Sequence, residues 1–303
     1  MIRQCAHTVL MIRPSGFGFN PETSVSNIFQ QQPDAASGLQ EQARVEFEGL
    51  VDLLRRHGID VWVYEEAGSE PMPDAVFPNN WLSFHDDKIV VYPLLAESRR
   101  AERSEELLQM LRYRTRIRDT EDFSSFEDHG LFLEGTGSLV LDRVQKTAYA
   151  NLSSRTHAGM ADIWCQENGY ERVMFTAITG SGQEIYHTNV LLSIGETQAV
   201  VCSGTIRHTT EREAVLSSLR RTHDVMEISE EQMRRFCGNL LQLQNREGQK
   251  YWVMSTGALA AFRPDQLKWL EQDARILHSP LHTIETVGGG GARCMMAEVF
   301  YGA

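Results

Sequence analysis

The chain has 303 residues and a net charge of −12 at pH 7, and it is 42% hydrophobic and 23% charged. This composition is typical of a soluble globular protein and excludes disordered and collagen-like classes. The acidic balance argues against general binding of nucleic acid or anionic membranes, which both need a basic surface, and leaves small-molecule chemistry or protein contact.

In chain order, the first predicted element is a strand in "HTVLMIRP" (7–14). A long polar segment follows at 13–33, whose length and polarity suit a lid, although whether it closes over a site stays open at this point. The next segment, 39–58, is predicted to be a helix, because its apolar residues recur at helical spacing and Gly58 stands where a C-terminal cap would. Those apolar residues are Val45, Phe47, Leu50, Val51 and Leu54. A strand is predicted in "DVWVYEE" (60–66), and further helices at 97–114 and 210–222.

Four later segments share one pattern: a small or amide residue, a β-rich run, a polar turn and a second β-rich run. This pattern is typical of a β-hairpin. The four segments are 79–93, 135–156, 187–205 and 238–258, and they recur at intervals of roughly 50 to 57 residues. One further step along the chain reaches "GGGGARCMMAEVF" (288–300), which we interpret as a fifth copy of the first hairpin strand. Its expected partner is 7–14, so the two ends of the chain would close a ring.

Five β/α units of similar length predict one domain over residues 1–303, of the α/β class, with five pseudo-symmetric blades around a central channel. The alternative is a two-layer fold in which hairpins alternate with helices and the spacing is a coincidence.

In such a ring the starts of corresponding strands point to one central place. The residues at those starts are Asn79 and Asn80, Glu134, His187 and Asn189, and Cys294. A cysteine can act as a nucleophile, a histidine can exchange protons near neutral pH, and a carboxylate can orient that histidine. Each residue alone has a simpler interpretation: Cys294 as a small core residue, His187 as a satisfied polar residue, Glu134 as a charge at a strand end.

The five cysteines are odd in number and scattered, with no zinc or redox spacing, which fits a reducing cytoplasm. We find no HExxH motif, no phosphate-binding glycine loop, no signal peptide and no membrane span in the sequence. We therefore expect a cytoplasmic protein without a metal or cofactor.

Five motifs in a fixed order give the chain a resemblance to a known superfamily. They are "MPDAVFPNNW" (72–81), "LEGTGSLVLD" (133–142), "NLSSRT" (151–156), "YHTNV" (186–190) and "GGGGARCM" (288–295). With them the sequence resembles, over almost its whole length, the guanidino-group-modifying enzymes of the arginine deiminase and amidinotransferase superfamily, the penteins. The resemblance implies the same five-bladed fold.

The resemblance also implies roles for single residues. Cys294 matches the family nucleophile, His187 the general acid/base and Glu134 the carboxylate that orients it. Asp74 matches the residue that holds the substrate's α-amino group, and Phe77 would lie against the substrate's aliphatic stem. Arg155 matches the arginine that binds the substrate carboxylate, because a guanidinium binds a carboxylate through two parallel hydrogen bonds. A surface salt bridge is the alternative for Arg155.

This chain departs from guanidino-specific relatives at Asn79, Asn80 and Asn189, where many of them carry acidic residues. A cationic guanidinium with only N–H donors needs carboxylate acceptors, whereas a neutral ureido group with a carbonyl oxygen suits amides. The departure favours a ureido amino acid, and so resembles the citrulline-hydrolase branch that yields ornithine, ammonia and CO2. Which amine leaves first stays open.

Three other functions remain open. The nearest is an arginine deiminase or dimethylarginine-type hydrolase. The others are an amidinotransferase, which needs an acceptor amine, and a non-catalytic pentein that only binds. In each enzymatic case we expect a small amino-acid substrate as the partner, with a homo-oligomer possible.

Overall fold

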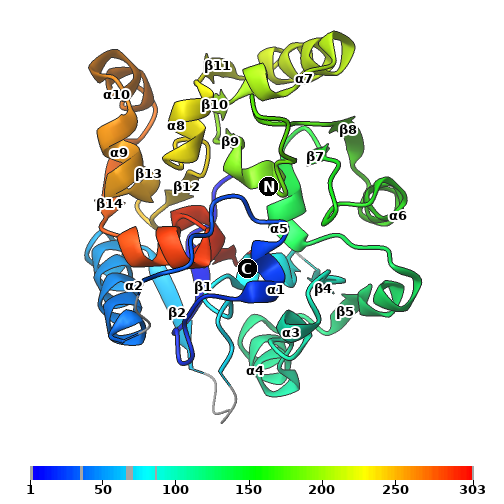
Figure 1. Ribbon diagram of the computed structural model, residues 1–303, viewed down its shortest axis with the longest axis vertical. Coiled ribbons are helices and arrows are strands. Elements are labelled where there is room, and N and C mark those ends of the chain that lie inside the picture. The colour runs from blue at the N-terminus through cyan, green and yellow to red at the C-terminus, as the bar shows by residue number, and fades with distance from the viewer. Residues whose placement is uncertain (1–2, 35–36, 66–70, 86, 302–303) are drawn as a thin grey trace.

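The computed structural model describes residues 3–34, 37–65, 71–85 and 87–301, and it contains five three-stranded sheets arranged as a ring (Figure 1). The sheets are β15-β1-β2, β3-β4-β5, β6-β7-β8, β11-β10-β9 and β12-β13-β14. The ring confirms the predicted five-bladed α/β propeller. The strands are β1 Thr8–Ile12, β2 Asp60–Tyr64, β3 Leu82–Phe84, β4 Lys88–Val91, β5 Asp119–Asp122, β6 Leu139–Asp142, β7 Thr147–Asn151, β8 Glu171–Phe175, β9 Leu192–Ile194, β10 Gln198–Val201, β11 Asp224–Glu227, β12 Leu241–Gln244, β13 Lys250–Ser255, β14 Arg275–Ser279 and β15 Ala297–Glu298.

Every blade repeats one strand pattern. The first strand pairs antiparallel with the second, and the second pairs parallel with the third, as in β6, β7 and β8. Parallel neighbours need a long crossover connection, which here is helical. The longer crossover helices lie around the outside of the ring in Figure 1. They are α2 Leu39–Arg56, α4 Glu105–Thr115, α6 Ala158–Asn168, α7 Thr209–Arg220 and α10 Pro264–Leu270; the shorter helices are α1 Pro21–Ser24, α3 Glu97–Arg100, α5 Gly135–Ser138, α8 Glu230–Arg234 and α9 Thr256–Ala261.

The chain ends close the ring as predicted. β15 pairs antiparallel with β1, with Val9 opposite Glu298 and Leu10 opposite Ala297. The strand is much shorter than the predicted segment 288–300, because a π-helical turn over Ile284–Gly288 and a 3-10 turn over Ala292–Met295 occupy the residues before it. These turns bend the backbone across the centre of the ring.

Two helix predictions need correction. In α2 the buried face is Ala43, Phe47, Leu50, Val51 and Leu54, while Val45 is 60% exposed because it lies on the opposite side of the helix. Gly58 follows the last turn with a φ of 79°, as expected of a cap. The predicted helix at 97–114 is two helices, α3 and α4, because Ser104 begins α4 by accepting a hydrogen bond from the Leu107 N–H.

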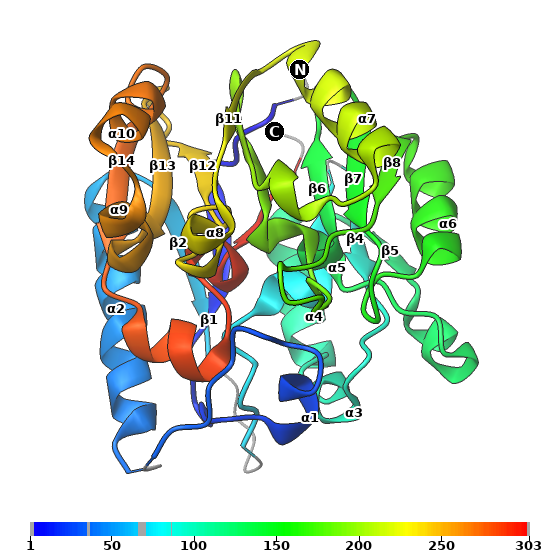
Figure 2. The same ribbon diagram turned by 45° about the horizontal axis from the view of Figure 1, so that its top comes forward.

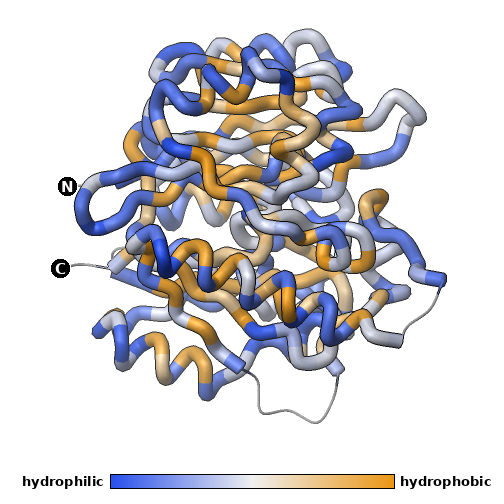
Figure 3. Tube along the Cα trace, turned by 90° about the vertical axis from the view of Figure 1, so that its left-hand side faces the viewer, coloured by the Kyte–Doolittle hydropathy of each residue, from blue (hydrophilic) through white to orange (hydrophobic). Residues whose placement is uncertain are grey.

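Apolar and hydrophilic residues alternate along the outer helices, as the orange and blue of Figure 3 show, so each helix turns one side to a sheet. Across the described ranges no helix is long and apolar enough to cross a membrane. In Figure 2 α1 lies at the lower side of the molecule, whereas the N-terminal segment before β1 lies at its upper side. The ring therefore has two distinct ends.

Candidate active site

A short turn precedes the first strand in most blades, and these turns meet at the centre of the ring. They are Pro78–Asn80, Gly135–Ser138, Thr188–Val190 and Ala292–Met295. They and their flanking residues carry the side chains predicted to converge. A small cavity there is lined by Asp74, Phe77, Asn80, Arg155, His187 and Cys294, together with Thr23, Asn27, Arg99, Tyr186, Gly288 and Gly290. Three predicted site residues do not line the cavity, but each contacts a residue that does: Glu134 contacts His187, Asn79 contacts Asn80, and Asn189 contacts Cys294.

Cys294 is only 3% exposed, and its sulfur lies between two amides. The Nδ2 atoms of Asn189 and Asn239 lie 3.5 and 3.4 Å from Sγ, within reach to donate to it. Burial raises the pKa of the Cys294 thiol, while the hydrogen bond from Asn239 opposes that rise. The free protein therefore holds Cys294 as a thiol, and the thiolate needs a base to form.

His187 lines the same cavity, and its Nε2 lies 2.8 Å from Oε2 of Glu134. Burial lowers the pKa of His187 to about 4, even though Glu134 favours its charged form. Burial opposes ionisation of Glu134, but the charge of Arg155 and the hydrogen bond from His187 hold the pKa of Glu134 well below its ordinary value. A neutral His187 thus donates its Nε2–H to an ionised Glu134 and keeps Nδ1 as a proton acceptor.

Asn80 lies beside a buried arginine that the sequence analysis did not single out. Arg99 is 2% exposed, and its Nη1 donates to Oδ1 of Asn80 at 2.7 Å. Glu102 pairs with Arg99 at 2.8 Å. The Nδ2 of Asn80 donates to Oδ1 of Asn79, whose own Nδ2 is buried without a partner. The amide oxygen of Asn80 therefore already accepts from a guanidinium.

The polar segment predicted as a lid lies over the cavity, and α1 within it is near the centre of the ring in Figure 1. Asn20 Nδ2 and Thr23 Oγ1 donate to Oδ2 of Asp74 at 2.7 and 3.1 Å. Within the described ranges no ion pair joins Asp74 to a cationic side chain. Its carboxylate is thus held in place by neutral donors.

Arg155 is buried, so the surface salt bridge considered for it is wrong. It pairs with Glu134 at 3.3 Å, donates to the Thr23 carbonyl and to Ser26 Oγ, and lies over the Tyr186 ring. In this state Arg155 joins the Glu134 carboxylate to the polar segment 13–33 over the cavity, which we call the covering segment. Its proposed contact with a substrate carboxylate stays a prediction.

The four glycines before Cys294 are packed closely rather than flexible. A Cβ on Gly290 would lie 2.7 Å from the Phe77 ring, and Gly289 has a φ of 68°, which favours glycine. The Tyr186 hydroxyl donates to the Gly289 carbonyl at 2.8 Å. The glycine run therefore lets the chain pass between aromatic side chains to reach Cys294.

Sequence reasoning missed Asn239 and Arg99 as site residues. Asn239 occupies the repeat position of Asn80 and Asn189, so the repeat register could have indicated it. Arg99 lies on the short helix α3, and no sequence motif or repeat position indicated that it would contact Asn80. Within the described part of the chain, no three histidine, cysteine or acidic side chains are grouped so that they could hold a metal ion.

Comparison with solved structures gives the same fold. An unliganded arginine dihydrolase from the ornithine-ammonia cycle in cyanobacteria (ArgZ) matches with a TM-score of 0.75 and 16% identity, over 97% of this chain but only 41% of that one. Its separate N-terminal domain, bound to substrate, matches with a TM-score of 0.74 over 97% of this chain and 98% of that one, again at 16% identity. A dimethylarginine dimethylaminohydrolase variant with an S-methyl-L-thiocitrulline adduct matches with a TM-score of 0.67 and 14% identity, over 98% of this chain and 99% of that one. At these identities the likeness shows the fold alone.

The chain thus spans about two-fifths of the full-length cyanobacterial dihydrolase. A comparison with curated protein sequences found no match. A family model described as N,N dimethylarginine dimethylhydrolase, eukaryotic, matches residues 13–301, which covers the cavity and all the motifs noted in the sequence. The chain therefore belongs to the N,N dimethylarginine dimethylhydrolase family, within the guanidino-group-modifying pentein superfamily.

Proposed function

We propose that this protein hydrolyses the C–N bonds of a ureido amino acid, with citrulline as substrate and ornithine, ammonia and CO2 as products. The observation that carries this proposal is the ring of amides around the nucleophile. Asn189 and Asn239 contact Sγ of Cys294, and Asn80 lines the same cavity. A ureido group can accept from these amides through its oxygen and donate to them through its nitrogens.

The charges nearby support a neutral reacting group. Asn80 accepts from the buried Arg99, so a cationic guanidinium placed there would lie close to another guanidinium. Burying a charge without a compensating partner is costly. Of the carboxylates at the site, Glu134 is paired with Arg155 and Glu102 with Arg99.

Asp74 is the carboxylate whose partners are neutral donors, and it lines the cavity with Phe77. It suits the α-ammonium group of an amino acid, and Phe77 suits the methylene chain. For Arg155 to bind the substrate carboxylate, its hydrogen bonds to Ser26 or Thr23 would have to open. Those bonds belong to the covering segment, so substrate entry would also move that segment.

The reaction follows from the protonation states. Cys294 attacks the ureido carbon while its proton passes to Nδ1 of His187, and Glu134 stabilises the imidazolium. Collapse of the tetrahedral intermediate breaks one C–N bond, and His187 protonates the departing amine. Water, deprotonated by His187, then displaces Cys294 and releases a carbamate, which decomposes to CO2 and the second amine.

The second candidate is a guanidino hydrolase acting on arginine or a methylated arginine. The family description favours it, because that family is named for dimethylarginine hydrolysis. The same Cys294, His187 and Glu134 would serve that reaction.

Product analysis separates the two functions. The purified protein is incubated separately with citrulline, arginine and dimethylarginine, and ornithine, citrulline, ammonia and methylamines are quantified. We expect ornithine and ammonia in a one-to-one ratio from citrulline. Formation of citrulline from arginine or dimethylarginine, with citrulline itself unchanged, overturns the proposal.

A further inference from the structure

Asn239 presents an amide of fixed polarity to the sulfur of Cys294. Its Oδ1 accepts from the backbone N–H of Arg293 at 3.1 Å, and its Nδ2 donates to the backbone carbonyl of Asn189 at 2.7 Å. If the amide turned over, its oxygen would face that carbonyl and its nitrogen would face the Arg293 N–H, so both hydrogen bonds would be lost. Nδ2, with its second hydrogen, therefore stays 3.4 Å from Sγ, nearer than Oδ1 at 3.8 Å.

The chain around Cys294 leaves room for this amide. Asn239 is 1% exposed, stands shortly before β12, and is not among the residues that line the cavity. A Cβ on Gly291 would lie 2.7 Å from Oδ1 of Asn239, so the last of the four glycines permits the close approach. The amide thus contacts the sulfur without being part of the cavity wall.

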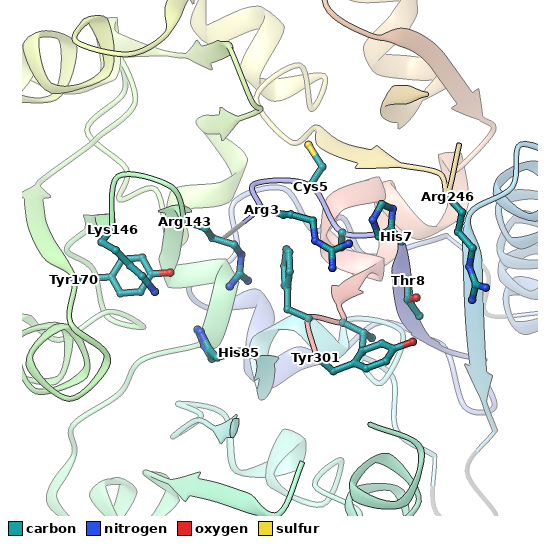
Figure 4. Close-up of a pocket in the computed structure, with 13 residues that line it drawn as sticks. Arg3, Cys5, His7, Thr8, His85, Arg143, Lys146, Tyr170, Arg246 and Tyr301 are labelled. Carbon is teal, nitrogen blue, oxygen red and sulfur yellow. The ribbon is translucent and has the colours of Figure 1, made fainter. Parts of the chain in front are cut away.

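Cys5 offers a comparison within the same chain, because it is also buried beside an amide of fixed polarity. It is 5% exposed and lines a larger cavity, of about 310 Å³, where Figure 4 labels it among the lining residues. Its neighbour is Gln242, whose Oε1 accepts from the Glu196 N–H at 2.7 Å and whose Nε2 donates to Asp273 Oδ2 at 2.7 Å. The sulfur of Cys5 donates to that Oε1 at 3.1 Å.

The two cysteines therefore face amides of opposite polarity. An N–H donor bonds a thiolate more strongly than a thiol, whereas an amide oxygen bonds only the S–H and so favours the neutral form. Burial raises the pKa of both thiols. The charge of Glu196 adds to the rise in the pKa of Cys5, whereas the hydrogen bond from Asn239 opposes the rise in the pKa of Cys294. The contacts thus single out Cys294 as the sulfur prepared for ionisation.

We propose that Asn239 is a catalytic residue, whose fixed Nδ2–H stabilises the Cys294 thiolate during attack. The inference rests on Cys294 being the nucleophile of the proposed function, but not on which substrate it attacks. After the thiol proton has passed to His187, the sulfur carries the negative charge, and this is the state that the N–H stabilises. Once the S–C bond has formed, the sulfur is only a weak acceptor, and the same N–H becomes available to the substrate.

Alkylation of the free enzyme by iodoacetamide tests the proposal without a substrate, because the thiolate is the form that displaces iodide. Labelling of Cys294 and Cys5 is followed by mass spectrometry of their peptides at several pH values. We expect Cys294 to be labelled faster than Cys5 in the wild type, although Cys5 lines the larger cavity.

Asn239→Ala should slow the labelling of Cys294 at mildly alkaline pH by about tenfold, the effect of losing one hydrogen bond to a charged group. The rise of the labelling rate with pH should also move to higher pH, which a purely structural role would not cause. Asn168→Ala, which removes an asparagine side chain at the end of α6, is the matched control and should leave the rate unchanged.

Asn239→Asp separates stabilisation of the thiolate from support of the backbone. The new side chain can still accept from the Arg293 N–H, but a carboxyl group carries at most one proton and cannot serve both the Asn189 carbonyl and the sulfur. We expect it to slow the labelling of Cys294 at least as much as Asn239→Ala does, with Cys5 still protected in both variants.

A wild-type labelling rate of Cys294 in either variant of Asn239, or labelling of Cys5 before Cys294 in the wild type, overturns the proposal. These rates do not depend on the substrate. Slow labelling in both variants together with no turnover of citrulline would therefore uphold the role of Asn239 and remove only the proposed substrate.

Discussion

The cavity at the centre of the ring has two chemically different sides. Around the sulfur of Cys294 the contacts are amides, from Asn189 and Asn239. On the other side Asp74 offers a carboxylate, and Arg155 a guanidinium that now pairs with Glu134. Under the proposed function the difference separates two tasks: the charged groups would hold the zwitterionic end of an amino acid, and the amides would hold a neutral group at the reacting carbon.

The largest expected effect comes from removing Cys294, the proposed nucleophile, on the side of the cavity lined by amides. Cys294→Ala should lower kcat for citrulline by at least about 10³-fold, because no covalent intermediate forms. Steady-state ornithine production measures it. Cys202→Ala, which removes another buried cysteine, is the matched control and should retain turnover. Undiminished activity of Cys294→Ala would remove the covalent mechanism.

Glu134 connects the two sides, since it contacts both His187 and Arg155. Glu134→Gln should lower kcat by about 10²–10³-fold, because His187 loses the partner that stabilises its imidazolium. Glu41→Gln, on the exposed surface of α2, controls for loss of one negative charge and should be neutral. A Glu134→Gln protein that unfolds like wild type and keeps full kcat would contradict this role.

Placing a charge among the amides around Cys294 tests whether the two sides of the cavity bind different parts of the substrate. Asn189→Asp sets a carboxylate beside Sγ, which repels the thiolate and leaves acceptors facing the ureido oxygen. We expect kcat/KM for citrulline to fall about 10- to 100-fold, while arginine binds more tightly than before. Asn189→Ala separates loss of the amide from gain of charge and should not improve arginine binding. If Asn189→Asp prefers citrulline as strongly as wild type does, the amides do not select the substrate.

The smallest effect concerns pH. The pKa of His187 is lowered to about 4, so the neutral base is present above that pH and is lost as pH falls through it. The pH dependence of kcat/KM reports the pKa values of groups in the free enzyme. We therefore expect kcat/KM to be half of its plateau value near pH 4 and to stay level through neutral pH. An acid limb near pH 6.5 would show that His187 is not held neutral by burial.

Much of the fold, and the meeting of Cys294, His187 and Glu134 at one cavity, followed from the sequence, because the hairpin repeat fixes which strand starts meet at the axis. Periodicity placed Cys294, His187 and Glu134 together although they are far apart in the chain. It could not place Arg99 or the covering residues Asn20 and Thr23, since those contacts depend on how non-repeating segments pack. The error at Val45 has the same origin: hydrophobicity alone did not show which side of α2 faces the sheet.

Binding without chemistry tests the central claim most directly. Dissociation constants of citrulline and arginine are measured calorimetrically with Cys294→Ser protein, which keeps the shape of the site and cannot turn over through the thiolate. Our account predicts that citrulline binds at least about tenfold more tightly than arginine, since only the neutral group is matched by the amides. Arginine binding as tightly as citrulline, or more tightly, would contradict it.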